Sequence, residues 1–218
     1  MKNKKTKIAS YLLAILPILV VAVLYNRLPE QMPMHWNLDG TVEYDSKSLL
    51  WILSSMGLFF TVLFEVVPKI DPKKENYKKF SKSYDLFILA LVIFMDVVLG
   101  ITLVEGMMPN TIPVGKVVML LLGALFIILG NILPKVKTNF YIGIRTPWAL
   151  SDPDVWNRTQ RLGGKLLFLL GVVTVISGFL FNQIACYVIL MIGVVLMSVI
   201  VMVMSYRWYQ EVQKGQKL

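Results

Sequence analysis

Three carboxylates lie within or at the edge of long apolar runs of this chain, and they are the first groups that could do chemistry. Asp96 stands near the middle of one run, and Asp85 precedes it by eleven residues, so a helix would carry both on about the same face. Glu65 belongs to another run and shares a helical stripe with Ser54 and Thr61. A carboxylate at the centre of a bilayer costs roughly 2.5–3.5 kcal/mol on insertion scales, so Asp96 should face protein or water, or be protonated. The two stripes could form a proton or ion path, or hydrogen bonds between helices could satisfy them.

The only histidine offers little further chemistry. His35 lies near Asp39, Glu43 and Asp45, but these ligand types and spacings match no metal pattern, so we expect neither a metal site nor a cofactor. The sequence contains no HExxH, GxSxG, Walker or CxxC motif, and no histidine stands within plausible reach of Cys186. Because the scattered carboxylates form no acid–base couple, the sequence predicts a protein that is not an enzyme.

Long apolar segments must position these groups. The chain has 218 residues, of which 56% are hydrophobic, and its mean hydropathy is +0.67. Runs of 18 or more apolar residues with few charges are typical of transmembrane helices, so we expect an all-α integral membrane protein. The six expected spans are 8–25, 49–67, 84–104, 114–133, 165–181 and 184–206.

The basic residues predict how the chain crosses the membrane. If the N-terminus is cytoplasmic, 19 of the 22 Lys and Arg residues fall on the cytoplasmic side, and only Arg27, Lys47 and Lys116 fall on the other. This distribution follows the positive-inside rule, so we expect a multi-pass protein of the cell membrane with both termini in the cytoplasm. Lysines beside an anionic leaflet account for the net charge of +9, so the expected partner is the lipid bilayer and not nucleic acid.

The loop 26–48 is then extracellular and predicts a short β-hairpin. Asp39-Gly40 is a tight-turn signal between two short stretches of alternating apolar residues. A hairpin with exposed aromatic residues could hold an extracellular peptide as an added strand, or it could cover the outer mouth of the helices as a plug. The candidate peptide-binding residues are His35, Trp36, Asn37 and Tyr44.

The connector 134–164 is predicted to be cytoplasmic and folded. Pro147 restricts Thr146 to extended geometry, and Ser151 is the expected N-cap of a helix that ends near a bend at Gly163–Gly164. This helix could lie along the inner interface, with tryptophans at the headgroups and arginines on lipid phosphates. Alternatively, the connector could dock a cytoplasmic protein or close the helix bundle as a floor. Its candidate residues are Asn131, Pro134, Asn139, Arg145, Thr146, Pro147, Trp148, Trp156, Arg158 and Arg161.

Glycines recur every seven residues in the fourth and fifth spans. Seven residues return to almost the same face of a helix, so each series forms a smooth stripe. Small residues let membrane helices approach closely, so we expect the fourth and fifth spans to pack as a tight hairpin around the connector. The glycines are Gly123 and Gly130 in the fourth span, and Gly164, Gly171 and Gly178 along the fifth.

Two stretches resemble known families. "LPEQMPMHWNLDGTVEYDSKS" resembles an outer-loop domain found at the start of many small bacterial membrane proteins. "GNILPKVKTNFYIGIRTPWALSDPDVWNRTQRLGGKL" resembles the signature of the SdpI family of immunity proteins. The chain departs from the family at Gln160, where members often have histidine, so a titratable role at that position is not expected. The resemblance implies two units, 1–70 with the outer loop 26–48, and 84–206 with four helices and the connector.

The resemblance also implies a function. Members of this type protect the producing bacterium from a secreted membrane-active peptide toxin, and the type case recruits a cytoplasmic transcriptional repressor to the membrane. The expected partners are therefore a peptide toxin at the outer face and a repressor at the inner face. A different class of function, a small ion- or proton-coupled transporter or channel using the carboxylates, stays open from the residues alone.

Overall fold

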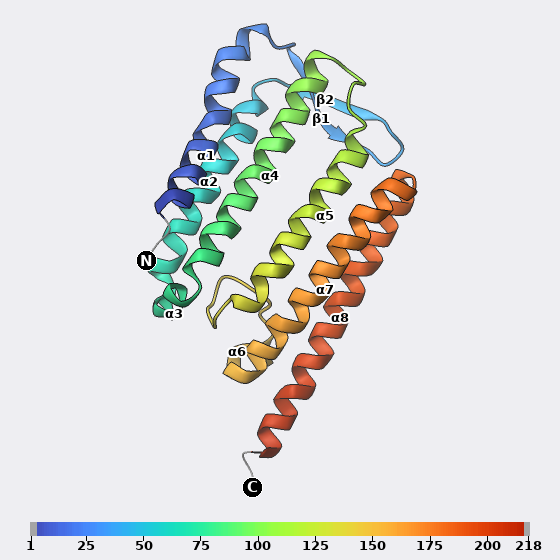
Figure 1. The fold of residues 1–218 in the computed structure, drawn as a ribbon. Helices are drawn as coiled ribbons and strands as arrows, with labels where there is room; N and C mark the ends of the chain where they lie inside the picture. Colours follow the sequence, from blue (N-terminus) through green and yellow to red (C-terminus); the bar gives the residue numbers. More distant parts are fainter. Residues whose placement is uncertain (1–3, 216–218) are drawn as a thin grey trace.

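Six long helices dominate the chain, as predicted. The computed structural model describes residues 4–215, and Figure 1 shows their arrangement. All six helices are long and apolar enough to cross a membrane, which confirms the all-α membrane fold with six spans. Their bounds are α1 Lys4–Leu24, α2 Leu49–Ile70, α4 Ser81–Met107, α5 Val114–Ile132, α7 Pro153–Leu180 and α8 Gln183–Gly215.

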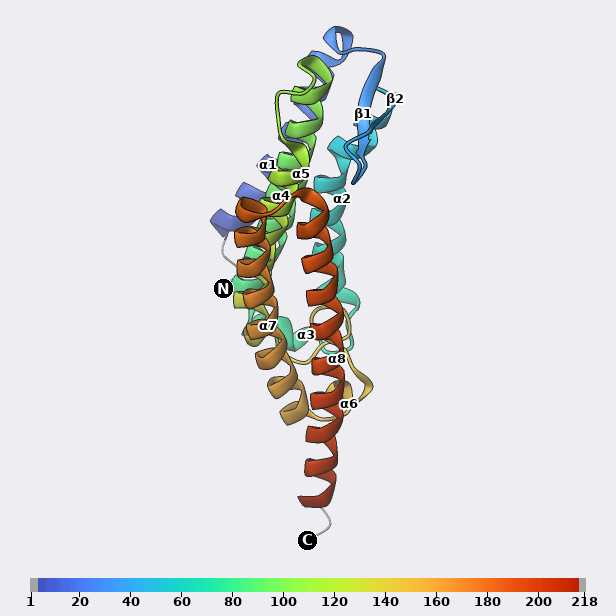
Figure 2. The ribbon, with the colours of Figure 1, turned by 90° about the vertical axis from the view of Figure 1, so that its right-hand side faces the viewer.

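Shorter elements lie at both ends of the helix bundle. Strands β1 (Gln31–Trp36) and β2 (Val42–Ser46) form the predicted antiparallel hairpin between α1 and α2. This hairpin lies at one end of the bundle, and the short helices α3 (Lys74–Lys79) and α6 (Pro147–Ser151) lie at the other (Figures 1 and 2). Two 3-10 turns, η1 and η2, follow α1 and α5 at Tyr25–Arg27 and Leu133–Lys135.

The long helices pack in two groups of three. Helices α1, α2 and α4 contact one another, α7 packs against both α5 and α8, and α4 also contacts α5. The division into units 1–70 and 84–206 stays a prediction. It assigns α4 to the second unit, but α4 packs mainly on α1 and α2 of the first. Large apolar side chains on the outward faces are exposed, including Val23 at 75% and Leu180 at 68%, as helices that face lipid require.

Helices α5 and α7 meet along the predicted glycine stripes. A Cβ built on Gly171 would lie 2.6 Å from the carbonyl oxygen of Gly123, and one built on Gly130 would lie 2.5 Å from the backbone nitrogen of Phe168. Gly178 has more room, since its nearest neighbour, on Leu120, would be 3.2 Å away. The backbones of α5 and α7 are therefore in direct contact, and at these points a side chain would push them apart.

The start of α7 differs from the sequence prediction. Asp152, not Ser151, is the N-cap, and its carboxylate accepts hydrogen bonds from the backbone N–H groups of Asp154 and Val155. Ser151 instead ends α6, which takes its own N-cap, Thr146, in the predicted extended conformation. The Asp152 carboxylate satisfies two N–H groups of the first helical turn at once, so Asp152 is preferred to Ser151 as the N-cap.

No bend occurs at Gly163–Gly164, contrary to the prediction. Helix α7 runs unbroken from Pro153 to Leu180, so the expected interfacial helix and the fifth span are one helix. Both glycines are needed for close approach instead: a Cβ on Gly163 would lie 2.0 Å from the Ile144 side chain, and one on Gly164 would lie 2.7 Å from the carbonyl oxygen of Gly130. Glycine stands at these two positions because neighbouring atoms leave no room for a side chain, and not because the helix has to bend there.

Candidate functional site

The hairpin is fixed to the helices by one buried side chain. Met32 of β1 is wholly buried, and it packs with Val21, Leu50 and Leu99 of three different helices. A Cβ built on Gly106 of α4 would lie 2.1 Å from the Met32 methyl group, so this glycine provides the space for that side chain. The strand is therefore held firmly over one end of the bundle.

The turn of the hairpin is closed by its own side chains. Gly40 has φ +87°, a left-handed conformation that glycine adopts without strain. The Asp39 carboxylate accepts hydrogen bonds from the Thr41 hydroxyl at 2.7 Å and from the Thr41 N–H at 2.9 Å. These bonds lower the pKa of the Asp39 carboxyl, and the bond from the Thr41 hydroxyl has the larger effect. Asp39 therefore stays ionised at neutral pH. Asn37 donates to Glu43 at 2.9 Å and braces the two strands.

A cavity of about 340 Å³ lies between the hairpin and the ends of the helices. Trp36 and Asn37 line it, whereas His35 and Tyr44, the other two candidate peptide-binding residues, are exposed and do not. Lys116 lies at its edge, with its ammonium 5.2 Å from the centroid of the Phe179 ring. The remaining lining residues come from the hairpin, the end of α4, the α4–α5 loop, α5, the end of α7, the α7–α8 turn and the start of α8. They include Glu105, Asn110, Met119, Phe181 and Gln183.

Sequence reasoning missed part of this cavity lining. Glu105 is 6% exposed and accepts hydrogen bonds from the N–H groups of Asn110 and Ile112, so it holds the α4–α5 loop in place. Lys116 just inside the fourth span was the available signal, because a charge there requires a partner or an aqueous edge. Gln183 gave no signal, since only the fold brings the α7–α8 turn under the hairpin.

The connector at the opposite end is organised around Asn139. This wholly buried side chain donates to the carbonyl groups of Lys137 and Ile142, and its oxygen accepts from the backbone N–H groups of Tyr141 and Ile142. Tyr77 donates to the same oxygen at 3.2 Å. The Asn139 amide makes four hydrogen bonds to backbone groups that a helix or strand would otherwise pair with one another. The loop is therefore folded although it is neither a helix nor a strand.

Asp71 ties the connector to the end of α2. Its carboxylate accepts from the Tyr77 hydroxyl at 2.8 Å, from the Phe140 N–H at 2.9 Å and from the Lys73 N–H at 2.7 Å. Burial, together with the hydrogen bond to Asp71, raises the pKa of Tyr77 well above its ordinary value, so the phenol remains a donor. The sequence prediction had not connected these residues with the connector, which lies more than 60 residues further along the chain.

Gln160 and Trp156 bind the connector to α7. The Gln160 amide accepts from the Ile144 N–H at 3.0 Å and donates to the Ile144 carbonyl at 2.7 Å, and the Trp156 indole donates to the Val136 carbonyl at 2.9 Å. Both side chains are wholly buried, which does not fit the interpretation in which Trp156 faces the lipid headgroups. Its indole N–H requires an acceptor, and the folded connector supplies one inside the protein.

The rest of the connector faces outward or contacts α8. Thr146 and Ser205 share a hydrogen bond of 2.5 Å, and the ring of Trp148 lies 5.1 Å from that of Tyr206. Arg158 pairs with Glu211 of α8 at 3.2 Å. Of the candidate connector residues, Asn131, Pro147, Arg145, Arg158 and Arg161 are exposed, and Pro134 is partly buried against Gly164.

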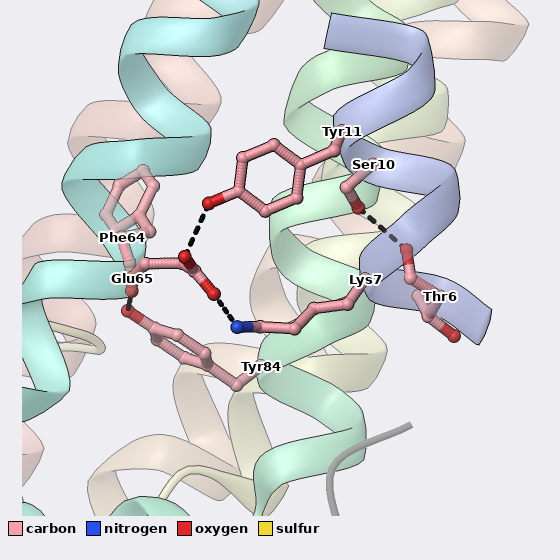
Figure 3. A network of polar contacts seen from close by, with 7 residues as sticks. All are labelled: Thr6, Lys7, Ser10, Tyr11, Phe64, Glu65 and Tyr84. Carbon is pink, nitrogen blue, oxygen red and sulfur yellow. Dashed lines mark hydrogen bonds and ion pairs between the residues drawn. The ribbon is translucent and has the colours of Figure 1, made fainter. Parts of the chain in front are cut away.

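The three predicted polar groups of α2 have partners within the protein. Glu65 pairs with Lys7 of α1 and accepts a hydrogen bond from Tyr11, as Figure 3 shows. Ser54 and Thr61 donate to carbonyl groups of their own helix.

The two carboxylates of α4 lie in different surroundings. Asp85 is 6% exposed and lines a second cavity together with Glu65. Asp96 is partly buried, and its carboxylate lies 3.7 Å from the position that a Cβ would take on Gly57. Within residues 4–215, Asp96 makes no hydrogen bond or ion pair, and no three His, Cys, Asp or Glu side chains gather as a metal site.

A multi-pass membrane protein with a β-hairpin over one end and a folded connector at the other is the class that this fold defines. Residues 135–205 match the model of the SdpI/YfhL protein family, and residues 12–58 match a domain of unknown function (DUF1648). The chain is also 28% identical to "Immunity protein SdpI" of Bacillus subtilis (strain 168) over 210 residues, which cover 95% of this chain and 97% of that protein. No solved structure matches it. These matches confirm the resemblance to the SdpI family seen in the connector.

Proposed function

We propose that this protein is an immunity protein that protects its cell against a secreted membrane-active peptide, and that the cavity beneath the hairpin holds part of that peptide. The likeness to an immunity protein along 95% of the chain carries the first half of the proposal. The second half rests on the cavity of about 340 Å³, which offers aromatic surface, one cation and the side-chain amides of Asn37, Asn110 and Gln183 at the end of the spans.

The chemistry of the cavity suits a peptide side chain or terminus. Trp36 and Phe179 provide apolar walls, and Lys116 provides a positive charge that a peptide carboxylate would neutralise. Because Met32 fixes the hairpin to the helices, the cavity is largely pre-formed, and binding would cost little ordering entropy.

A survival assay tests this function. The gene is expressed in a sensitive bacterium, which is then challenged with candidate secreted peptides. We expect the wild type to protect, Trp36→Ala in the cavity wall to lose protection, and Tyr44→Ala on the exposed face of the same hairpin to retain it, all at equal membrane levels. Loss with Tyr44→Ala alone would place the peptide on the open strand β2 and would contradict the cavity as its site.

This proposal requires the hairpin to face outward, as the distribution of Lys and Arg predicts. Cysteines placed at exposed Thr41 and at exposed Ser151 report the orientation, because Cys186 is buried and 2% exposed. An impermeant thiol reagent on intact cells should label Thr41→Cys and spare Ser151→Cys. The opposite labelling would contradict the outward hairpin and both termini in the cytoplasm.

A second proposed role is the recruitment of a cytoplasmic transcriptional repressor by the connector. The observation that favours it is a rigid scaffold, held by Asn139 and Gln160, that leaves Arg145 and Arg161 exposed. A folded surface with exposed arginines is suited to hold an acidic partner. Replacing both arginines with glutamine should release the partner from the membrane fraction while protection is kept, and retention of the partner would contradict this role.

The alternative function, a small ion- or proton-coupled transporter or channel, depends on Asp96. This carboxylate has no hydrogen-bond or ion-pair partner within residues 4–215 and faces the space beside Gly57. Protein carrying Asp96→Asn should lose ion-dependent transport in vesicles if this function is correct. Unchanged toxin protection by the same variant would favour the immunity function instead.

A further inference from the structure

The second cavity lies at the end opposite the hairpin. It measures about 720 Å³ and is framed by α1, α2, α3 and α4. Phe64, Pro68 and Ile88 form apolar parts of its wall, and Lys69, Lys74, Lys78 and Lys7 bring four ammonium groups to it. Candidate span α2 ends here and candidate span α4 begins here, so we expect the cavity to lie at the level of the lipid headgroups.

Two of the four lysines are already neutralised by acidic residues of the same cavity. Lys7 pairs with Glu65, whose other oxygen accepts from Tyr11 (Figure 3), and Lys78 pairs with Glu75 at 2.6 Å. That hydrogen bond with Lys78 lowers the pKa of the Glu75 carboxyl, so the pair is ionised at neutral pH.

Two lysines remain available to a ligand. Lys69 and Lys74 are exposed and both line the cavity. Within residues 4–215 neither ammonium group makes a hydrogen bond or ion pair, although the charge of Lys74 also acts on Glu75. The third acidic group, Asp85, is buried at 6% exposure and has a partner of its own. The unneutralised charge at the rim is therefore positive, and the wall below it is partly apolar.

We propose that this cavity is a binding site for an anionic phospholipid, with the phosphate held by Lys69 and Lys74 and the start of an acyl chain against Phe64 and Ile88. Two cationic donors at one place suit a phosphate, and basic pockets between membrane helices bind anionic lipid headgroups. The apolar wall distinguishes a lipid from a free phosphate, which would gain nothing from it. This site is independent of the proposed immunity function, because it lies at the other end of the bundle.

Native mass spectrometry of the full chain in detergent tests the proposal. The probes are phosphatidylglycerol, phosphatidylcholine with the same acyl chains, and inorganic phosphate. We expect phosphatidylglycerol to bind more tightly than phosphatidylcholine, and we expect its affinity to fall about fivefold for each of Lys69→Gln and Lys74→Gln. The matched control is Lys135→Gln with Lys137→Gln, which removes the same charge from exposed connector positions outside the cavity and should leave the affinity unchanged.

Three results would overturn the site. The first is equal binding of the two lipids by the wild type. The second is an equal loss of affinity in the Lys69/Lys74 double variant and in the control, which would indicate general attraction to positive charge. The third is phosphatidylglycerol binding that inorganic phosphate displaces completely, since this would identify a phosphate site with no acyl-chain contact. All variants change exposed lysines, so folding is expected to persist, and circular dichroism of each variant checks this.

Discussion

Gly130 and Gly164 lie so close that a Cβ built on Gly130 would come within 2.8 Å of the carbonyl oxygen of Gly164, and the reverse distance would be 2.7 Å. Helices α5 and α7 therefore touch through their backbones, and the connector that joins them begins and ends at this contact. Backbone atoms cannot rotate away as a side chain can, so the position of α7 against α5 is defined within narrow limits.

Enlarging a glycine in this contact should destabilise the protein. Gly171→Ala would place a methyl group 2.6 Å from the carbonyl oxygen of Gly123, and overpacking of this kind typically costs about 1–3 kcal/mol. The matched control is Gly100→Ala in α4, where a Cβ meets nothing within 4 Å. Thermal unfolding in detergent should show a lower midpoint for the first variant only, and equal midpoints would contradict the close contact.

A larger change at the same position tests whether α5 and α7 couple the two ends of the protein. A ligand at the hairpin end can shift an element only by binding one of its states better. Gly171→Leu should therefore disrupt protection or recruitment if this helix pair is the moving element. If the protein is inserted in the membrane and both activities are intact, α5 and α7 do not couple the two ends.

Gln160 should be needed for the folded connector, although it cannot titrate. Gln160→Ala leaves the N–H and carbonyl groups of Ile144 without partners, and an unsatisfied buried polar group costs about 1–3 kcal/mol. We expect faster hydrogen exchange at the Ile144 amide and a lower unfolding midpoint. The neighbouring exposed Arg161→Ala is the control, and an unchanged exchange rate in Gln160→Ala would show that other contacts hold the loop.

The ion pair between Lys7 and Glu65 should fasten α1 to α2. Lys7→Gln leaves a partly buried carboxylate without its cation, whereas Lys7→Gln with Glu65→Gln removes both charges, so the double variant should recover part of the lost stability. The coupling energy from a double-mutant cycle should be on the order of 1 kcal/mol, because both groups are only partly shielded from solvent. Lys5→Gln, an exposed position on the same helix, is the control, and a coupling energy of zero would show that the pair does not contribute.

Tyr77 should make the protein less stable at alkaline pH. The pKa of Tyr77 is raised in the folded protein, chiefly by burial and then by Asp71. Its contribution to the free energy of unfolding is therefore complete below the ordinary pKa of 10.0 and decreases as the pH rises above that value. Tyr77→Phe removes a donor to Asp71 and Asn139, so it should be less stable at pH 7. Above pH 10 its stability should fall less steeply than that of the wild type. Unfolding midpoints from pH 7 to 11 measure both effects, and parallel curves would rule out Tyr77 as the titrating group.

The amino-acid sequence determined the six spans, the hairpin and the glycine contact. Each of these follows from a local pattern: apolar length for the spans, Asp39-Gly40 for the turn, and a spacing of seven for the stripes that meet between α5 and α7. Tertiary structure alone decided that Trp156 is buried, that Asp71 and Tyr77 hold the connector, and that Lys116 and Gln183 lie under the hairpin. The physical reason is that a polar side chain takes whichever partner the fold brings near, and partners more than 60 residues away leave no periodic signal in the sequence.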